Sequence, residues 1–480
     1  MNVKPFLMAH LAALSLHAWA DQKWRGFPYL LQDPLLTHPN VLDLGARLPG
    51  DHKSLACDSE VREPLHMQKT LSLATAVDMA LCNNPQVKSS WAAIKVQAGS
   101  LGEAKSAYAP TLNASISALS TETRYPDGQA PDSQNEGRSK YFNITWRLFD
   151  FGTRSANLEA AHHLLAAALA SHDAALQSVL TSVVGAYFDA ITAQATWHAR
   201  SQAAELATDT WQTTLRREGK GAAALSDTLQ AETALAKTKL ALSRAQGDAQ
   251  KARSVLLYVM GMPTNTTLTL PDDHASEQNL KSEELGEWLR GAQSKHPAIA
   301  AARAQLAAAK AKVRATQAEG LPTLDYTQNH YQNGFPNQVL SATNNLYRTV
   351  GVTLNVPLFE GFARTYKIKG AQAQSEKSEA ELKNTELQVL MEVVKAHADV
   401  QSSFDNLQAS QQLLRAAQFA VQSSQRRYDK GAADVLELLS TQNALADAQQ
   451  ERVRCLSDWR SSRLRLMSSA GVLGLTLLNL

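Results

Sequence analysis

The sequence has 480 residues, of which 44% are hydrophobic and 19% are charged, and its formal net charge at pH 7 is +2. This length is sufficient for two or three ordinary domains. A charge so close to neutral argues against a nucleic-acid-binding protein that relies on a basic surface.

The amino-terminal segment, residues 1–20, has the features of a secretory signal peptide. A basic residue precedes an apolar stretch, and the small-x-small triplet AWA at 18–20 closes it, which predicts cleavage before Asp21. No cysteine directly follows this point, so we expect no lipid anchor there. No later window approaches about 18 uninterrupted apolar residues, so we expect no transmembrane helix in the mature chain. Any membrane that the chain crosses must then be crossed by strands.

Residues 21–70 form an N-terminal extension that is rich in proline and aromatic residues and shows no clear period. Two structures are open for it: a segment that wraps other helices, or a partly disordered one. The chain has three cysteines, Cys57, Cys82 and Cys455. In an oxidising compartment Cys57 and Cys82 can form a disulfide. Three buried free thiols are the alternative.

An internal duplication is the most informative feature of the sequence. The motif YAPTL at 108–112 returns as GLPTL at 320–324, and RRxxKGAA at 216–223 returns at 426–433, displacements of 212 and 210 positions. The dipeptide Asn84-Pro85 likewise matches His296-Pro297. The duplication predicts the following segments: a first repeat at 71–262, a linker at 263–282, a second repeat at 283–470 and a C-terminal tail at 471–480, whose helical or extended state is open.

Each repeat is predicted to run in the order helix, strand, loop, strand, very long helix, tight turn and helix. In the first repeat, Pro85 opens a helix at the N1 position, which proline tolerates. Two strands follow at about 111–120 and 140–149, because apolar residues alternate with polar ones there. The polar, turn-rich segment 125–139 is the loop between them.

The very long helix of the first repeat runs from Gly152 to Arg217, with Gly185 as its one weak point. Lys220-Gly221 makes the turn, and a helix returns over about 222–260. At 1.5 Å per residue the long helix spans roughly 100 Å, and the two shorter helices together reach nearly as far. The short pair can therefore stack end to end beside the long helix.

The second repeat is predicted to have the same plan. Its strands lie at about 323–332 and 345–358, and its helices at 297–319, 364–430 and 433–469. The strands of both repeats emerge at one end of the helical rod, and the glycine turns lie at the other.

The strands indicate an oligomer. Strands of about 10 residues with one apolar face suit a tilted, membrane-spanning barrel. A bilayer permits only closed barrels, and known barrels begin at about eight strands, so four strands per chain are too few. We therefore expect a mainly α protein with β-strands that pools these strands with copies of itself.

Several segments resemble the TolC family of outer-membrane channels, over roughly residues 71–470. The resemblance implies a homotrimer, with a twelve-stranded outer-membrane β-barrel continuous with a long periplasmic α-helical barrel. It also implies docking with a periplasmic adaptor protein, at hairpin tips around Gly221 and Gly431, and with an inner-membrane transporter, ABC-type or proton-driven. The similar segments are LSLATAVDMALCNNPQV, YAPTL, LFD and LFE, and RRYDKGAADVLELLSTQNALADAQQ.

The turn of the second repeat is where we expect the periplasmic entrance. Asp434 and Glu437 are three residues apart and share a helix face. Under three-fold symmetry each becomes a ring of like charge, which attracts cations and constricts a pore. The alternative is a solvated helix start, whose acids the macrodipole favours.

The resemblance assigns further gate residues. Glu437 stands at the position of the first entrance acid and Ser440 at that of the second. Tyr428 matches the gate tyrosine, and Asp227 its partner on the neighbouring turn. Ala433 stands where the family has an arginine, which puts one latch contact in doubt.

Other functions find little support in the sequence. His162, His163 and His172 share one helix but lack the i, i+4 spacing of a metal site, so we expect a solvated or lumen-facing helix. No GxSxG, HExxH, Walker or CxxC motif occurs, so we expect no enzyme and no cofactor. A periplasmic coiled-coil scaffold would leave the strands unexplained. Type I protein (toxin) secretion is favoured over small-molecule or drug efflux by the CNNP variant and the N-terminal extension.

Overall fold

The computed structural model describes residues 70–127, 131–271, 284–333 and 345–472. The signal peptide, the N-terminal extension and the last eight residues lie outside this part. Within it, the chain forms two compact units. The sheet unit comprises Lys95–Leu158 and Leu321–Leu358, and the helical unit comprises the other described residues.

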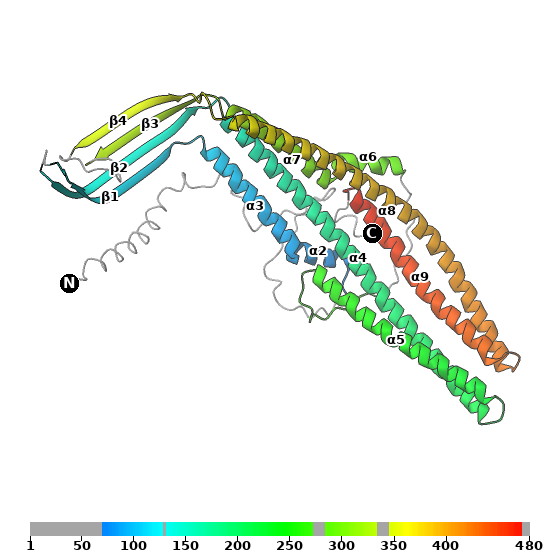
Figure 1. The fold of residues 1–480 in the computed structure, drawn as a ribbon. Helices are drawn as coiled ribbons and strands as arrows, with labels where there is room; N and C mark the ends of the chain where they lie inside the picture. The colour runs from blue at the N-terminus through cyan, green and yellow to red at the C-terminus, as the bar shows by residue number, and fades with distance from the viewer. Residues whose placement is uncertain (1–69, 128–130, 272–283, 334–344, 473–480) are drawn as a thin grey trace, which may run out of the picture. The chain divides into compact units, whose positions relative to one another are not determined.

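The described elements follow the predicted order, with one extra short helix at the start of each repeat (Figure 1). They are α2 (Leu73–Asn83), α3 (Pro85–Ser106), β1 (Thr111–Thr123), β2 (Ser133–Phe149), α4 (Thr153–Glu218), α5 (Leu225–Val259), α6 (Leu285–Lys295), α7 (Pro297–Ala318), β3 (Thr323–Gln332), β4 (Leu346–Asn355), α8 (Ala363–Asp429) and α9 (Val435–Ser469).

The sheet has the order β1-β2-β3-β4, and every neighbouring pair is antiparallel. The register joins Thr111 to Thr145, Thr145 to Thr327 and Thr327 to Gly351. Odd-numbered residues of β1, β3 and β4, and of β2 as far as Arg147, where a bulge shifts the register, therefore share one face, which is mostly polar. Even-numbered residues such as Ile116 (74% exposed) make the other face, which is mostly apolar.

The first strand pair is longer than predicted. The ladder continues past Ala118↔Arg138 to Thr123↔Ser133, so β2 begins at Ser133 instead of near 140, and the connecting loop is shorter than 125–139. Both faces of this outer part are polar, so hydrophobic alternation could not reveal it. By contrast, β3 at Thr323–Gln332 lies where the sequence predicted it.

One arginine in each repeat donates hydrogen bonds to backbone carbonyls next to the strands. In the sheet unit, Arg154 donates to the carbonyls of Arg147 (2.7 Å) and Leu148 (3.2 Å) and to the carboxylate of buried Asp150 (3.0 Å). Its counterpart in the helical unit, Arg364, donates to the carbonyl of Gly320 at 2.9 Å. Each arginine satisfies carbonyl groups where the regular ladder ends.

The two long helices have 66 and 67 residues, close to the predicted ranges, and span about 100 Å each. Neither contains proline, and Gly185 of α4 has open space where a Cβ would be. One window of α4 is long and apolar enough to cross a membrane by composition, but half of that window is buried within the chain. Part of this apolar surface packs in the core described next.

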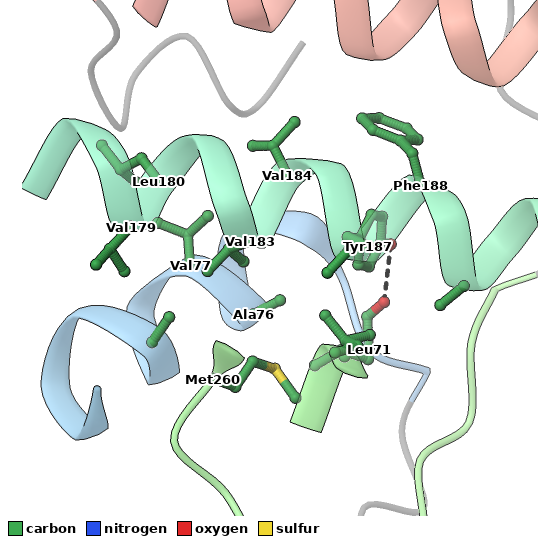
Figure 2. Packing of buried hydrophobic residues seen from close by; sticks show 14 of the residues in the cluster. Leu71, Ala76, Val77, Val179, Leu180, Val183, Val184, Tyr187, Phe188 and Met260 are labelled. Carbon is green, nitrogen blue, oxygen red and sulfur yellow. Dashed lines mark hydrogen bonds between the residues drawn. The ribbon is translucent and has the colours of Figure 1, made fainter. Parts of the chain in front are cut away.

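The main core lies where α2, α4 and the end of α5 meet (Figure 2). Leu180 and Val183 of α4 are fully buried, as are Val77 of α2 and Met260. The hydroxyl of Tyr187 donates to the carbonyl of Leu71 at 3.0 Å, which fixes the chain ahead of α2 on this core.

The short helices α2 and α6 were not predicted. Each has 11 residues and ends directly before an X-Pro dipeptide. Asn84 and His296, the residues before the prolines, have ψ angles of 125° and 126°, because proline disfavours helical backbone in the preceding residue. Each of these two residues separates a short helix from the helix that follows it. The apolar pattern runs on across the break, so the sequence does not show that there are two helices.

The predicted end-to-end stacking of the short helices is confirmed at a junction in each repeat. In the first, the side-chain amide of Asn84 donates to the carbonyl of Val259 at 2.8 Å. Gly261 lies against this point, and a Cβ on it would be 2.7 Å from the carbonyl carbon of Asn83. In the second repeat, Gly471 lies against His296 in the same way, and a Cβ on Gly471 would be 3.0 Å from the Cα of His296.

The cysteines and histidines differ in part from expectation. Cys455 is a buried free thiol, and Cys82 is disulfide-bonded. Cys57 lies outside the described residues, so the Cys57–Cys82 pairing stays a prediction. His162 is exposed as expected. The expectation of a solvated face is wrong for His172, which is fully buried with its Nδ1 2.7 Å from the hydroxyl of Ser90.

Candidate functional site: the paired hairpin tips

The turns of the two helix hairpins, α4–α5 and α8–α9, end their long helices with the same backbone motif. Gly221 and Gly431 adopt φ angles of +73° and +72°, which glycine adopts without strain. The amides of Ala222 and Ala432 donate to the carbonyls of Arg217 and Arg427, both at 2.8 Å. This is the Schellman arrangement, so the repeated KGAA sequence is a helix stop in both hairpins.

The helices that leave the turns start differently. In the second hairpin Asp434 is the N-cap of α9, and its carboxylate accepts from the amide of Glu437 at 2.8 Å. In the first hairpin the N-cap is Ala224, which has no side-chain acceptor. There Asp227 accepts from the amide of Ala224 at 3.3 Å. Each arrangement satisfies one amide of a helix N-terminus.

A small apolar cluster joins the two hairpins of one chain. Its members are Ala231 of α5, Tyr428 of α8, and Val435, Leu438 and Leu439 of α9, with Trp211 and Ala234 packed against them. The five members are each 6% exposed or less, whereas Trp211 and Ala234 are partly buried. The tips of one chain are therefore a single packed structure.

Tyr428 is the most connected side chain of this structure. It is 5% exposed, and its hydroxyl lies 3.0 Å from the hydroxyl of fully buried Thr214 on α4. The guanidinium of Arg217 lies 4.3 Å from the centroid of its ring and donates to its carbonyl at 3.0 Å. Arg217 thus combines a cation–π contact with a charge-assisted hydrogen bond.

The expected pairing of Tyr428 with Asp227 is not made between the two hairpins of one chain. The tyrosine hydroxyl is engaged by Thr214, and the Asp227 carboxylate caps its own helix. The equivalence of the two repeats explains why: position 227 corresponds to position 437, and both acids stand at the third residue of a helix, next to their own turn.

The entrance acids occupy distinct environments. Glu437 accepts from Arg427 at 2.7 Å, with the two side chains 38% and 54% exposed. An ion pair this exposed stabilises by about 0.2–1 kcal/mol. Asp434 and Ser440 are exposed, Ser440 on the second turn of α9. The structure brings Tyr428 to the centre of the site and leaves the acids at its surface.

Sequence reasoning missed Thr214 and Arg217. Arg217 was visible as half of the repeated Arg-Arg pair, but its partner was not. A second hairpin-to-hairpin bond, from the amide of Gln442 to the hydroxyl of Thr210 at 3.0 Å, was also missed. Thr210 and Thr214 are four residues apart on α4, a spacing that places them on one side of the helix, and both contact the second hairpin.

Metal binding finds no support at the tips or elsewhere in the part that the structure describes. In that part, no group of three or more His, Cys, Asp or Glu side chains lies close enough to hold an ion. The chemistry available at the tips is therefore hydrogen bonding and charge.

The chain was compared with known proteins. Residues 76–262 and 288–472 match the family model described as outer membrane efflux protein. The chain is 35% identical over 406 residues to Protein CyaE of Bordetella pertussis, covering 84% of this chain and 85% of that one. It is 24% identical over 302 residues to alkaline protease secretion protein AprF of Pseudomonas aeruginosa, covering 62% of each.

The fold was compared with solved structures as well. The outer membrane protein VceC of Vibrio cholerae superimposes with a TM-score of 0.71 at 24% sequence identity, over 83% of this chain and 96% of that one. At this identity the likeness concerns the fold.

Proposed function

Because the chain belongs to the outer membrane efflux protein family, we propose that it is the outer-membrane exit duct of a type I protein-secretion machine. The family and the fold are those of a transport channel of the outer membrane, with a helical barrel in the periplasm. The exported substrate in this proposal is a polypeptide. Small-molecule efflux is the second candidate, which the family description favours.

The observation that best supports a membrane-spanning channel is that the sheet has one polar and one apolar face. Strands β1, β2 and β4 present polar residues on one face and exposed apolar residues on the other, among them Val352 (59% exposed) and Leu354 (63%). An open sheet of this kind cannot lie in hydrocarbon with unpaired edges. Among the described residues, β1 and β4 each pair with one strand only, so we infer that their outer edges pair with further copies. Three copies give the twelve strands of a closed barrel.

The choice of a polypeptide substrate rests on similarity. AprF, whose name describes protease secretion, matches this chain over about three-fifths of both lengths. The helical barrel would receive its substrate from an inner-membrane transporter and a periplasmic adaptor protein. For a polypeptide we propose a transporter of the ABC type.

We assign adaptor contact to the hairpin tips around Gly221 and Gly431. Both glycines are exposed, and a Cβ added at either would meet only open space. Next to them, Leu225 is 62% exposed and Leu436 is 59% exposed. Two exposed leucines beside flat glycine turns suit an apolar contact with another protein.

The experiment is deletion of the gene from its host, followed by two measurements on the same strain. Mass spectrometry of the culture supernatant should show the loss of one or a few secreted polypeptides, and the parental chain supplied in trans should restore them. Minimal inhibitory concentrations of a panel of antibiotics and dyes should stay within about twofold. An unchanged supernatant together with increased drug susceptibility would replace secretion by efflux.

A further inference from the structure

The apolar face of the sheet carries a group of cations at one end only. This face consists of the even-numbered residues of β1–β4. Near the helix-connected ends of the strands it is uncharged, with residues such as Leu112, Trp146 and Leu354. Near the β1–β2 and β3–β4 turns it carries four basic residues, which we call the basic rim: Arg138, Lys140, His330 and Arg348.

The register places the members of the basic rim close together. Arg348 on β4 is directly opposite His330 on β3. Lys140 on β2 is opposite Gln332, which is the next residue after His330 on the same face of β3, so Lys140 and His330 are diagonal neighbours. Arg138 is the next residue beyond Lys140 on that face of β2. Opposed and diagonal side chains in a sheet are about 5–8 Å apart at their Cβ atoms. The basic rim therefore spans three adjacent strands as one patch.

The cations of the basic rim lack counter-charges within the described residues. Arg138, Lys140 and Arg348 are exposed, and none of them forms an ion pair with another described side chain. On the polar face the situation is different, because Arg147 is paired with Asp325 at 2.9 Å. The sheet thus neutralises its cation on the polar face and leaves those on the apolar face without a partner in the chain.

The nearest acids on the apolar face are engaged farther out, toward the turn. Glu136 accepts from Ser120 and from Gln134, both at 3.4 Å. Glu122 pairs with Arg124. Neither acid bonds to a member of the basic rim, so an external anion is the available partner.

The position of the basic rim identifies the kind of anion. A cation on the lipid-facing side of a barrel is strongly destabilising at the bilayer midplane but close to neutral at the interface. Both turns lie at the ends of the strands that are not connected to helices, so in an outer-membrane channel with periplasmic helices they belong to the outer leaflet. The headgroups of that leaflet carry phosphate on glucosamine.

We propose that the basic rim binds the phosphate groups of the phosphorylated glucosamine lipid, lipid A, of the outer leaflet. Arginine and lysine form charge-assisted hydrogen bonds to phosphate oxygens, and a cation next to an anionic membrane surface is stabilised by that surface. The inference rests on the outer-membrane location of the strands. It is independent of whether the exported substrate is a polypeptide or a small molecule.

The test is lipid binding to the purified, detergent-solubilised trimer, measured by native mass spectrometry with lipid A and with enzymatically dephosphorylated lipid A. The parent should bind lipid A at least about tenfold more tightly than the dephosphorylated lipid. The variant Arg138→Gln/Lys140→Gln/Arg348→Gln should lose this preference. A matched control, Lys237→Gln/Lys369→Gln/Lys383→Gln, removes three exposed helical lysines and should keep it.

Equal binding of the two lipids by the parent would overturn the proposal without any variant. Equal affinity of the parent for phosphatidylglycerol and lipid A would show general attraction to phosphate and would overturn the assignment to the glycolipid. If the triple variant gives no trimer, Arg348→Gln alone should reduce the preference, and the parental comparison decides in any case. Conductance in a planar bilayer should be the same for the parent and the triple variant. A parent that prefers lipid A but does not conduct would contradict the proposed channel and leave the lipid site intact.

Discussion

The guanidinium of Arg217 on α4 lies 4.3 Å from the centroid of the Tyr428 ring on α8 and donates to the tyrosine's carbonyl at 3.0 Å. Its equivalent in the second repeat, Arg427, instead pairs with Glu437 of its own hairpin at 2.7 Å. The residue next in the chain explains the difference, because Tyr428 corresponds to Glu218 in the first repeat. An arginine can lie over the tyrosine ring and cannot lie in this way over the glutamate. Arg217 therefore links two hairpins, and Arg427 stabilises one.

Glu437 should determine ion preference at the entrance. Replacing Glu437 with Ala removes one negative charge per subunit, three in a trimer, and we expect reduced preference for cations over anions. Reversal potentials in a salt gradient across a planar bilayer measure this. Glu379→Ala, which removes an exposed acid of α8, is the control and should keep the parental value. Full cation preference in Glu437→Ala would move the acidic ring elsewhere, with Asp434 as the next candidate.

Gly261 should tolerate no side chain. Its φ is +71°, and a Cβ would be 2.7 Å from the carbonyl carbon of Asn83. Left-handed backbone alone costs a non-glycine residue about 1–3 kcal/mol, and the contact adds to this. Gly261→Ala should lower the thermal midpoint of trimer dissociation. Gly247→Ala has open space inside α5, and its midpoint should stay equal or rise, since alanine favours helix by about 1 kcal/mol. Equal midpoints for both variants would refute a close junction.

His296 should make the second junction sensitive to acid. Its Nδ1 accepts from the amide of Ala298 at 3.2 Å, which requires the neutral ring. Burial lowers the pKa of His296 below its ordinary 6.5. The unfolded chain then binds more protons than the folded one, so stability is fully present above pH 6.5 and is lost as pH falls through the lowered pKa.

His296→Asn tests this prediction with the residue that the first repeat has at the equivalent position, Asn84. An asparagine can cap α7 without titrating. The fall in midpoint between pH 8 and pH 5 should be smaller in the variant than in the parent. An identical fall would assign the acid sensitivity to other groups.

The two faces of β4 should differ in their tolerance of charge. Val352 lies on the apolar face and is 59% exposed in one chain, whereas Thr353 lies on the polar face. An arginine facing lipid at the midplane costs about 2–4 kcal/mol per copy. Val352→Arg should therefore reduce the yield of trimer on unheated gels, and Thr353→Arg should leave it unchanged. The assigned faces would be wrong if the two variants assembled equally well.

The duplication made most of the fold predictable. A repeated RRxxKGAA and a repeated X-Pro dipeptide determine where the long helices end and where the short helices meet, because each acts through local backbone chemistry. The faces of the strands were equally readable, since apolar and polar residues alternate along them, as Ile144 and Thr145 do on β2. The outer part of β1–β2 was missed because its residues are polar on both faces.

The contacts of the site were less predictable. Arg217 and Arg427 stand in identical motifs, yet one contacts another hairpin and the other its own. That choice depends on which side chain the tertiary packing brings near, and Tyr428 lies 214 residues along the chain from its partner Thr214 on α4. The family resemblance suggested Asp227 as the partner of Tyr428, whereas within one chain the hydroxyl contacts Thr214.

The most direct measurement of the central claim, that the paired hairpin tips close an outer-membrane channel, is single-channel conductance of the purified trimer in a planar bilayer. The parent should show small, cation-preferring openings. Arg217→Ala/Tyr428→Phe removes the ring contact, the carbonyl bond and the bond to Thr214, each hydrogen bond contributing about 0.5–3 kcal/mol, and should open the tips and raise conductance severalfold. Arg216→Ala, whose arginine contacts only its own helix through Thr213, should conduct like the parent. Unchanged conductance in the double variant, or no channels from the parent, would contradict the account.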